Sequence, residues 1–195
     1  YTVTATDANG CTASITAIIN EPTLLTVAIT STTDVLCNGA ATGDATALAT
    51  GGTAAYTYQW SSGSATATAN SLAAGTYTVT ATDANGCTAS TTTTITEPTL
   101  LTVSITAITD ELCNGGSTGS ATALAAGGVS GYTYQWSNGS LTATASSLPI
   151  GTYTVTATDA NGCTVSTTAT ITEPTVLSVN IASSSNVLCN GGNTV

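Results

Sequence analysis

Apolar residues alternate with threonine and serine along most of this chain, and clusters of Gly, Asn, Asp or Pro separate the alternating runs. The clearest run is Thr76–Thr82, in which Tyr77, Val79 and Ala81 fall on one side of an extended chain and threonines fall on the other. A period of two predicts strands with one buried and one exposed face. Thr, Val, Ile and Tyr also favour strands, so we expect an all-β protein.

The same runs recur at a fixed interval. Asp-Ala-Asn-Gly-Cys begins at Asp7, Asp83 and Asp159, so the repeat is 76 residues long. A unit of this length is too long for a solenoid rung and suits a small β-sandwich. We expect four segments: strands F–G, the C-terminal part of one repeat, at 1–22; complete repeats at 23–98 and 99–174; and the N-terminal part of a further repeat at 175–195.

Within the first complete repeat the pattern predicts six strands separated by turn signals. They are expected at Leu24–Ile29, Asp44–Ala49, Tyr56–Trp60, Ala65–Ala69, Thr76–Thr82 and Thr88–Thr96. Asn85-Gly86 predicts a hairpin turn between the last two. Short strands at this spacing are typical of an Ig-like sandwich, with Trp60 in its core and Tyr77 as the tyrosine of the corner that precedes strand F.

Charge excludes several classes of function. The 195 residues include ten carboxylates and no Lys, Arg or His, which gives a net charge of −10. The usual general bases, a Schiff-base lysine and an arginine clamp are therefore absent, and we expect no enzyme. Nucleic-acid binding is not expected either, because no cation is available to neutralise phosphate. No apolar run reaches the length of a membrane helix.

Three stretches of the second complete repeat carry a family resemblance. They are Cys113–Ala123, which begins Cys-Asn-Gly-Gly; Gly131–Gly139, which contains Tyr-Thr-Tyr-Gln-Trp; and Leu148–Cys163, which contains Gly-Thr-Tyr-Thr-Val-Thr. Together they resemble the SprB repeat and, more widely, the PKD-type Ig-like domains. SprB repeats occur in very large surface adhesins of gliding bacteria. The resemblance implies tandem Ig-like or PKD-like domains, secretion to the bacterial cell surface and a role in adhesion or gliding motility, and it supplies no catalytic residue.

Six cysteines at regular positions indicate disulfides in an oxidising, extracellular setting. They are Cys11, Cys37, Cys87, Cys113, Cys163 and Cys189. Three kinds of pairing are open: neighbours 26 residues apart such as Cys87–Cys113, cysteines of one unit 50 apart (Cys37–Cys87 and Cys113–Cys163), and Cys37–Cys163, 126 apart.

The expected topology favours the third kind of pairing. In an Ig-like domain the loop between strands A and B, with Cys37, and the F–G turn, with Cys87, lie at opposite ends. Strands of nine residues span about 30 Å, whereas a disulfide requires Cα atoms within about 7 Å. In a head-to-tail string the A–B end of one domain faces the F–G end of the next. Cys37–Cys163 between adjacent domains is therefore the leading hypothesis, and Cys37–Cys87 with Cys113–Cys163 is the second.

Two further sites are candidates for binding. Asp83 and Asn85, with Asp34 from an adjacent end, are candidate calcium ligands; the competing explanation is that Asp and Asn bond their own turn backbone. Tyr56, Tyr58 and Trp60 are candidate glycan contacts, and core packing is the competing explanation. We expect no obligatory cofactor.

The function expected from these observations is structural. The chain is predicted to be part of the stalk of a large secreted bacterial adhesin, whose surface or glycan ligands bind other parts of the full-length protein. The alternatives are a self-assembling extracellular filament or sheath, in which chains associate laterally, and a carbohydrate-binding module.

Overall fold

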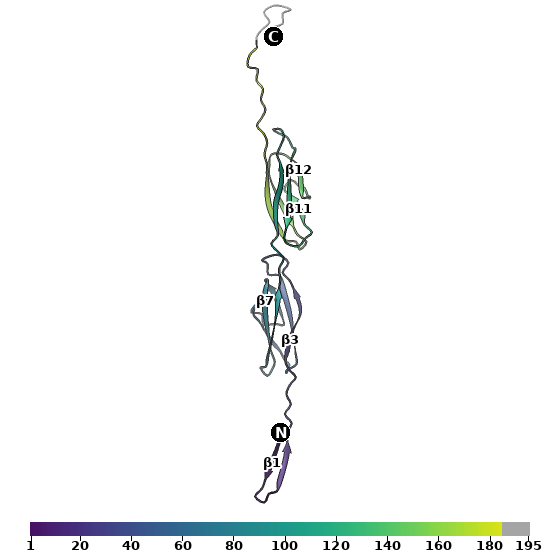
Figure 1. The fold of residues 1–195 in the computed structure, drawn as a ribbon, viewed down its shortest axis with the longest axis vertical. Helices are drawn as coiled ribbons and strands as arrows, with labels where there is room; N and C mark the ends of the chain where they lie inside the picture. Colours follow the sequence, from purple (N-terminus) through teal and green to yellow (C-terminus); the bar gives the residue numbers. More distant parts are fainter. Residues whose placement is uncertain (185–195) are drawn as a thin grey trace, which may run out of the picture. The chain divides into compact units, whose positions relative to one another are not determined.

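The computed structural model describes residues 1–184, and within that range it consists of strands, turns and extended segments without a helix. The chain divides into two compact units, Tyr1–Thr99 and Leu100–Val195. Figure 1 shows the strands of each unit along the colour ramp. The predicted all-β class is confirmed.

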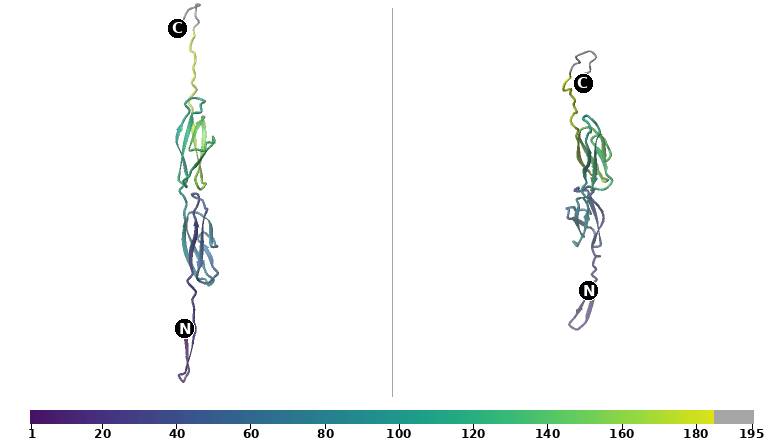
Figure 2. Two further views of the ribbon diagram at one scale, coloured as in Figure 1. Left: turned by 90° about the vertical axis from the view of Figure 1, so that its right-hand side faces the viewer. Right: turned by 45° about the horizontal axis from the view of Figure 1, so that its top comes forward.

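The first unit contains eight strands in three sheets. The strands are β1 Thr2–Thr6, β2 Thr12–Thr16, β3 Thr26–Thr33, β4 Gly43–Thr50, β5 Thr57–Trp60, β6 Thr68–Leu72, β7 Gly75–Thr82 and β8 Thr88–Ile95. β1 and β2 form a separate hairpin, and the others form two antiparallel sheets ordered β3-β4-β6 and β5-β7-β8. These orders correspond to the A-B-E and C-F-G sheets of an Ig-like sandwich, and Figure 2 shows both layers from two further sides.

The second unit repeats this topology. Its strands are β9 Thr102–Thr109, β10 Gly119–Ala126, β11 Thr133–Trp136, β12 Thr144–Leu148, β13 Gly151–Thr158 and β14 Thr164–Ile171. The sheet orders are β12-β10-β9 and β11-β13-β14. The register is also conserved between the units, since Gly75 faces Ile95 in one and Gly151 faces Ile171 in the other. The Ig-like sandwich is therefore confirmed in both units.

Small side chains and one tryptophan fill the space between the two sheets. In β4 every second residue is buried, and these are Gly43, Ala45, Ala47 and Ala49. Trp60 from the opposite sheet is 1% exposed. The remaining residues of this core are Val35, Ala69, Leu72, Val79 and Ile95. Alanines on one sheet leave room for the indole on the other, so a core without Phe or Met can still be close-packed.

The structure differs from the predicted strands in two places. Strand A was expected to end at Ile29, but β3 continues to Thr33 because the β3–β4 register shifts between Ile29 and Ser31. This bulge interrupts the alternation on which the prediction depended. The fourth strand was expected at Ala65–Ala69 and lies at Thr68–Leu72, because the preceding loop is bound instead to Trp60, whose backbone N–H donates to the Ser64 carbonyl at 2.8 Å.

Hydroxyl groups cover the outward face of β7 and β8, and neither strand contains a charged residue. The hydroxyls of Thr80 and Ser90 are hydrogen-bonded across the two strands at 2.9 Å, and those of Thr76 and Thr94 at 3.3 Å. Their counterparts in the second unit form the same bonds. Cross-strand threonine pairs of this kind stabilise a sheet and leave its outer face polar but uncharged.

Candidate functional site

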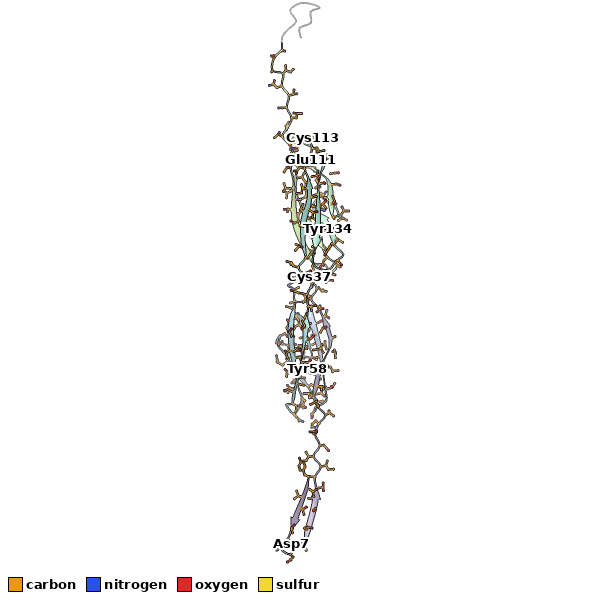
Figure 3. The ribbon with its side chains drawn as sticks, viewed as in Figure 1. Asp7, Cys37, Tyr58, Glu111, Cys113 and Tyr134 are labelled. Carbon is orange, nitrogen blue, oxygen red and sulfur yellow. The ribbon has the colours of Figure 1, made fainter. Side chains whose placement is uncertain are left out.

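The two cysteines of the first sandwich lie on two different turns. Cys87 ends the β7–β8 turn, whereas Cys37 lies in the long loop between β3 and β4. In the second unit Cys163 and Cys113 occupy the same two positions. Figure 3 labels Cys37 in the first unit and Cys113 in the second. These two turns are the candidate functional sites.

Asp83 closes the β7–β8 turn with its side chain. One carboxylate oxygen accepts hydrogen bonds from the backbone N–H groups of Asn85 and Cys87, both at 2.9 Å. The other oxygen accepts one from the Thr53 N–H, also at 2.9 Å. The Thr53 bond is the main cause that lowers the pKa of Asp83 below its usual value, and partial burial opposes it. Gly86, with φ +85°, completes the turn and donates its N–H to the Asp83 carbonyl.

The Cys37 loop is fastened to the segment that follows β8. The Gly39 N–H donates to a Glu97 carboxylate oxygen at 2.6 Å, and the Asn38 side-chain amide donates to the Pro98 carbonyl at 3.0 Å. The Thr96 N–H donates to Asp34 at 2.7 Å, and this bond lowers the pKa of the Asp34 carboxyl. Three hydrogen bonds therefore hold the loop to residues 96–98, by which the chain leaves the sandwich.

The Cys113 loop has one additional carboxylate. Glu111 occupies the position of Val35 and is buried. It accepts bonds from the Thr118 N–H and hydroxyl, and from the Gly119 N–H. The Thr118 N–H is the first cause that lowers the pKa of Glu111. Glu173 binds the Gly115 N–H at 2.7 Å, so this loop is also held to the segment after the last strand of its domain.

Sequence reasoning did not assign a role to Glu97 and Glu173. Their signal was present, because Glu-Pro-Thr recurs with the same 76-residue interval as the Cys-Asn-Gly motif that it binds. The repeat alone cannot show that residues almost 60 positions apart are in contact. The β3–β8 proximity that brings them together is a property of the closed sandwich.

The cysteines exist in two states. Cys37 and Cys163 are disulfide-bonded, whereas Cys11, Cys87 and Cys113 carry free thiols and are exposed. Cys189 lies outside the described residues. The second pairing hypothesis, Cys37–Cys87 with Cys113–Cys163, is therefore corrected, since Cys87 and Cys113 are free.

Distance within the domain explains this correction. The Cys37 loop binds Glu97 and Pro98, after the end of β8, whereas Cys87 directly precedes the start of β8. Eight residues of strand separate the two ends by about 26 Å. This is well beyond the reach of a disulfide, about 7 Å between Cα atoms.

The candidate calcium ligands do not come together within a unit. Asp83 binds Thr53 at one end of the sandwich, and Asp34 binds Thr96 at the other. The Asn85 side-chain amide donates to the Thr53 hydroxyl. Among residues 1–184 no group of three or more Cys, Asp or Glu side chains is arranged to hold a metal ion. The contacts of Asp83 and Asn85 are those of turn chemistry.

The candidate glycan contacts are part of the packing. Trp60 is buried and its indole N–H donates to the Thr66 carbonyl at 2.9 Å, so no ring face is available to a sugar and the prediction for this residue is wrong. Tyr56 and Tyr58 are half-buried. The Tyr56 hydroxyl donates to the Gly51 carbonyl, and the Tyr58 hydroxyl accepts the Ala49 N–H at 3.0 Å. Both tyrosines therefore serve the fold.

Tyr77 forms the expected tyrosine corner. Its hydroxyl donates to the Ala73 carbonyl at 3.1 Å, four residues upstream, and Tyr153 makes the same bond to Pro149. The sequence model of the SprB repeat matches residues 29–65 and 105–141. Each sandwich therefore contains one stretch that matches the SprB repeat. Each match begins in the first strand of a sandwich, β3 or β9, and extends past its tryptophan.

Two solved structures show limited similarity to this chain. One comprises three N-terminal domains of the bacteriophage RB49 Highly Immunogenic Outer Capsid protein, with 20% identity, a TM-score of 0.46, and coverage of 76% of this chain and 59% of that one. The other is a tetra-tandem repeat in the extending region of a large adhesion protein, with 22% identity, a TM-score of 0.24, and coverage of 87% and 55%. Both TM-scores are too low to support a conclusion. No curated protein matches the chain.

The described residues include no helix with the length and hydropathy needed to cross a membrane. The sequence contains no candidate catalytic group beyond carboxylates, hydroxyls and thiols. The two sandwiches differ in which of their cysteines are disulfide-bonded and in the carboxylates that hold their cysteine loops.

Proposed function

We propose that these SprB repeats form a structural stalk segment of a large secreted adhesin at the bacterial cell surface, without catalysis, and that a disulfide between Cys37 and Cys163 joins consecutive repeats. The supporting observation is the state of the cysteines: Cys37 and Cys163 are disulfide-bonded, and the other three described cysteines are free. Disulfides persist in extracellular proteins. The repeat family supports the adhesin assignment.

The proposed disulfide has a mechanical consequence. A chain pulled at its ends would transmit force from β3 to Cys37, through the disulfide to Cys163, and onward along β14. The 125 residues between the two cysteines, 38–162, would be excluded from extension even after their sheets had unfolded. A fully extended residue contributes about 3.4 Å, so about 430 Å of chain would be locked. Stalk segments that cannot lengthen would hold a ligand-binding region at a fixed distance from the cell.

Single-molecule stretching tests this proposal directly. The oxidised chain should reach a contour length about 430 Å shorter than the same molecule after reduction with a phosphine. The Cys37→Ser variant should behave like the reduced chain under both conditions, and Cys11→Ser should behave like the oxidised wild type. Equal contour lengths before and after reduction would refute the disulfide.

A second candidate function, lateral assembly into a filament or sheath, is favoured by the uncharged hydroxyl face of β7 and β8. Chains with a net charge of −10 repel one another, and this face is one on which they could approach without opposing carboxylates. Sedimentation analysis at rising salt concentration separates the two functions. A stalk segment stays monomeric when reduced, whereas a filament subunit associates, and more strongly as screening increases.

A further inference from the structure

The turn that follows β11 in the second sandwich carries the sequence Asn138-Gly139-Ser140. An asparagine followed two residues later by serine or threonine is an acceptor sequence for N-linked glycosylation, provided that the residue between them is not proline. This is the only such sequence in the chain. Attachment of a bulky glycan requires an accessible asparagine, and Asn138 is exposed.

Hydrogen bonds give this turn a fixed backbone. The Gly139 N–H donates to the Trp136 carbonyl, and the Trp136 N–H donates to the Ser140 carbonyl, both at 2.9 Å. The Asn138 side-chain carbonyl accepts the Ser140 N–H at 3.1 Å. This last bond uses the oxygen of the side-chain amide, whereas a sugar would be attached to its nitrogen. The turn therefore presents the amide without further ordering of the chain.

The turn lies on the flank of its sandwich. Trp136 pairs with Val155 in the middle of β13, and the Ser137 N–H donates to the Thr154 carbonyl at 2.9 Å. The chain enters this sandwich at β9 and leaves it after β14. A turn beside the middle of a strand is distant from both ends of the sandwich, so the exposure of Asn138 does not depend on what precedes or follows the repeat.

A hollow of about 350 Å³ lies directly beside the turn. This volume is at the lower end of the range for ligand pockets, about 300–1,000 Å³. None of its six lining residues is charged, and four of them carry a hydroxyl or amide group, which can bind sugar hydroxyls as donor or acceptor. The lining residues are Gln135, Trp136, Ser137, Gly139, Thr154 and Thr156.

The first sandwich has the same turn without the acceptor asparagine. Ser62 stands at the equivalent position, and the Gly63 N–H donates to the Trp60 carbonyl at 2.9 Å. The Gln59 side-chain amide donates to the same carbonyl at 3.2 Å, whereas Gln135 lines the hollow. The first sandwich is therefore an internal control for a glycan on the second.

We propose that Asn138 is a glycan attachment site and that the first sugar of the glycan lies in the hollow beside it. The donor is a sugar activated as a diphosphate, and a glycosyltransferase of the producing cell catalyses the transfer. The amide nitrogen attacks the anomeric carbon of the sugar, a C–N bond forms, and the diphosphate leaves with the electrons of the broken C–O bond. The amide proton passes to a base of the transferase. This site is independent of the pairing proposed for Cys37 and Cys163.

An attached glycan would cover part of the hydroxyl face of the second sandwich. Thr156 lines the hollow, and its hydroxyl is hydrogen-bonded to that of Ser166 on β14 at 2.8 Å. The hollow therefore reaches the counterpart of the uncharged β7–β8 face. A sugar in this place would keep neighbouring chains apart, which favours the stalk over lateral assembly.

The test uses the full-length protein purified from the cells that produce it. Chymotryptic cleavage after Trp136 and Leu141 releases the peptide 137–141, whose mass reports a glycan. We expect a glycan in the wild type and in Ser140→Thr, which keeps the hydroxyl, and none in Asn138→Gln or Ser140→Ala. Ser62→Asn is the matched variant of the first sandwich. It completes the same tripeptide in the same turn and should add a second glycan.

The position of the first sugar is tested by nuclear magnetic resonance of the glycosylated protein. We expect nuclear Overhauser contacts between this sugar and the methyl groups of Thr154 and Thr156. A glycan on Asn138 without these contacts would refute its place in the hollow. An unmodified Asn138, or an adduct that fragmentation locates on Ser137 or Ser140, would overturn the attachment site itself.

Discussion

Replacing Tyr58 with phenylalanine tests the role of the Tyr-Thr-Tyr-Gln-Trp motif. β6 pairs with β4 only as far as Thr46, and the Ala47 N–H still reaches the Ala67 carbonyl. The next N–H on that side of β4 belongs to Ala49, which is 3% exposed and donates to the Tyr58 hydroxyl at 3.0 Å. The Tyr58 hydroxyl therefore serves as the hydrogen-bond acceptor that a backbone carbonyl of β6 would supply if the strand continued.

The expected effect of the substitution follows from the loss of this hydrogen bond. Tyr58→Phe keeps the ring but leaves the Ala49 N–H buried without an acceptor, which costs about 1–3 kcal/mol. For a domain of this size each kcal/mol lowers the melting temperature by about 4–8 °C. Tyr134→Phe should produce the same loss in the second unit, because the Ala125 N–H donates to Tyr134 at 3.0 Å; both tyrosines are labelled in Figure 3.

Calorimetry of the wild type and the single variants measures these shifts. Tyr77→Phe is the control, because its acceptor, the Ala73 carbonyl, belongs to a residue that is exposed to water, and it should lower stability by less than Tyr58→Phe. The reasoning fails if Tyr58→Phe is within about 0.5 kcal/mol of the wild type, the scatter typical of surface substitutions.

Three further predictions concern the carboxylates. The pKa of Asp83 is lowered in the folded protein. Its contribution to folding stability is therefore complete above the ordinary aspartate pKa of about 3.9 and is lost as the pH falls through the folded value. The melting temperature of Asp83→Asn should consequently fall less on acidification than that of the wild type. Asp7→Asn is the control, since Asp7 lies in the separate hairpin and makes only the two turn bonds. Asp44 has a buried carboxylate oxygen without a hydrogen-bond partner, so Asp44→Ser, the residue at position 120, should stabilise the first unit by about 1 kcal/mol, as measured by urea unfolding. Excess chelator should leave the wild-type melting temperature unchanged, and a drop would indicate that Asp83 and Asn85 bind calcium.

Regular alternation made most of the sandwich predictable. Thr76–Thr82 and Thr88–Thr96 were placed within a residue of β7 and β8, because both strands alternate along their full length. The second half of β3 was missed at a bulge, where the pattern loses its phase. The SprB resemblance carried by the cysteine, tyrosine and tryptophan motifs is confirmed by the match at residues 29–65 and 105–141. The extent of each domain stays a prediction.

The candidate site was less accessible to sequence reasoning. Tyr58 and Trp60 are aromatic residues on a short strand, and such residues can either bind a ligand or pack in a core. For Trp60, burial in the folded chain excludes ligand binding. The Cys37–Cys87 pairing could be doubted from the expected Ig topology alone, since that topology places the two turns at opposite ends of the sandwich. The anchoring of Gly39 by Glu97 required the folded chain, because it joins residues 58 positions apart.

The separation of the two turns along β7 and β8 also makes the ends of a repeat electrostatically independent. Eight residues of strand keep Asp83 about 26 Å from the Asp34–Glu97 end, which is about three Debye lengths at physiological salt. A charge can thus be gained or lost at one end without affecting titration at the other. The second unit illustrates this freedom: a glutamate replaces Val35 in its cysteine loop, and the Asp159 turn makes the same three bonds as the Asp83 turn. Neighbouring copies of one repeat can therefore diverge at either end while their sheets stay the same.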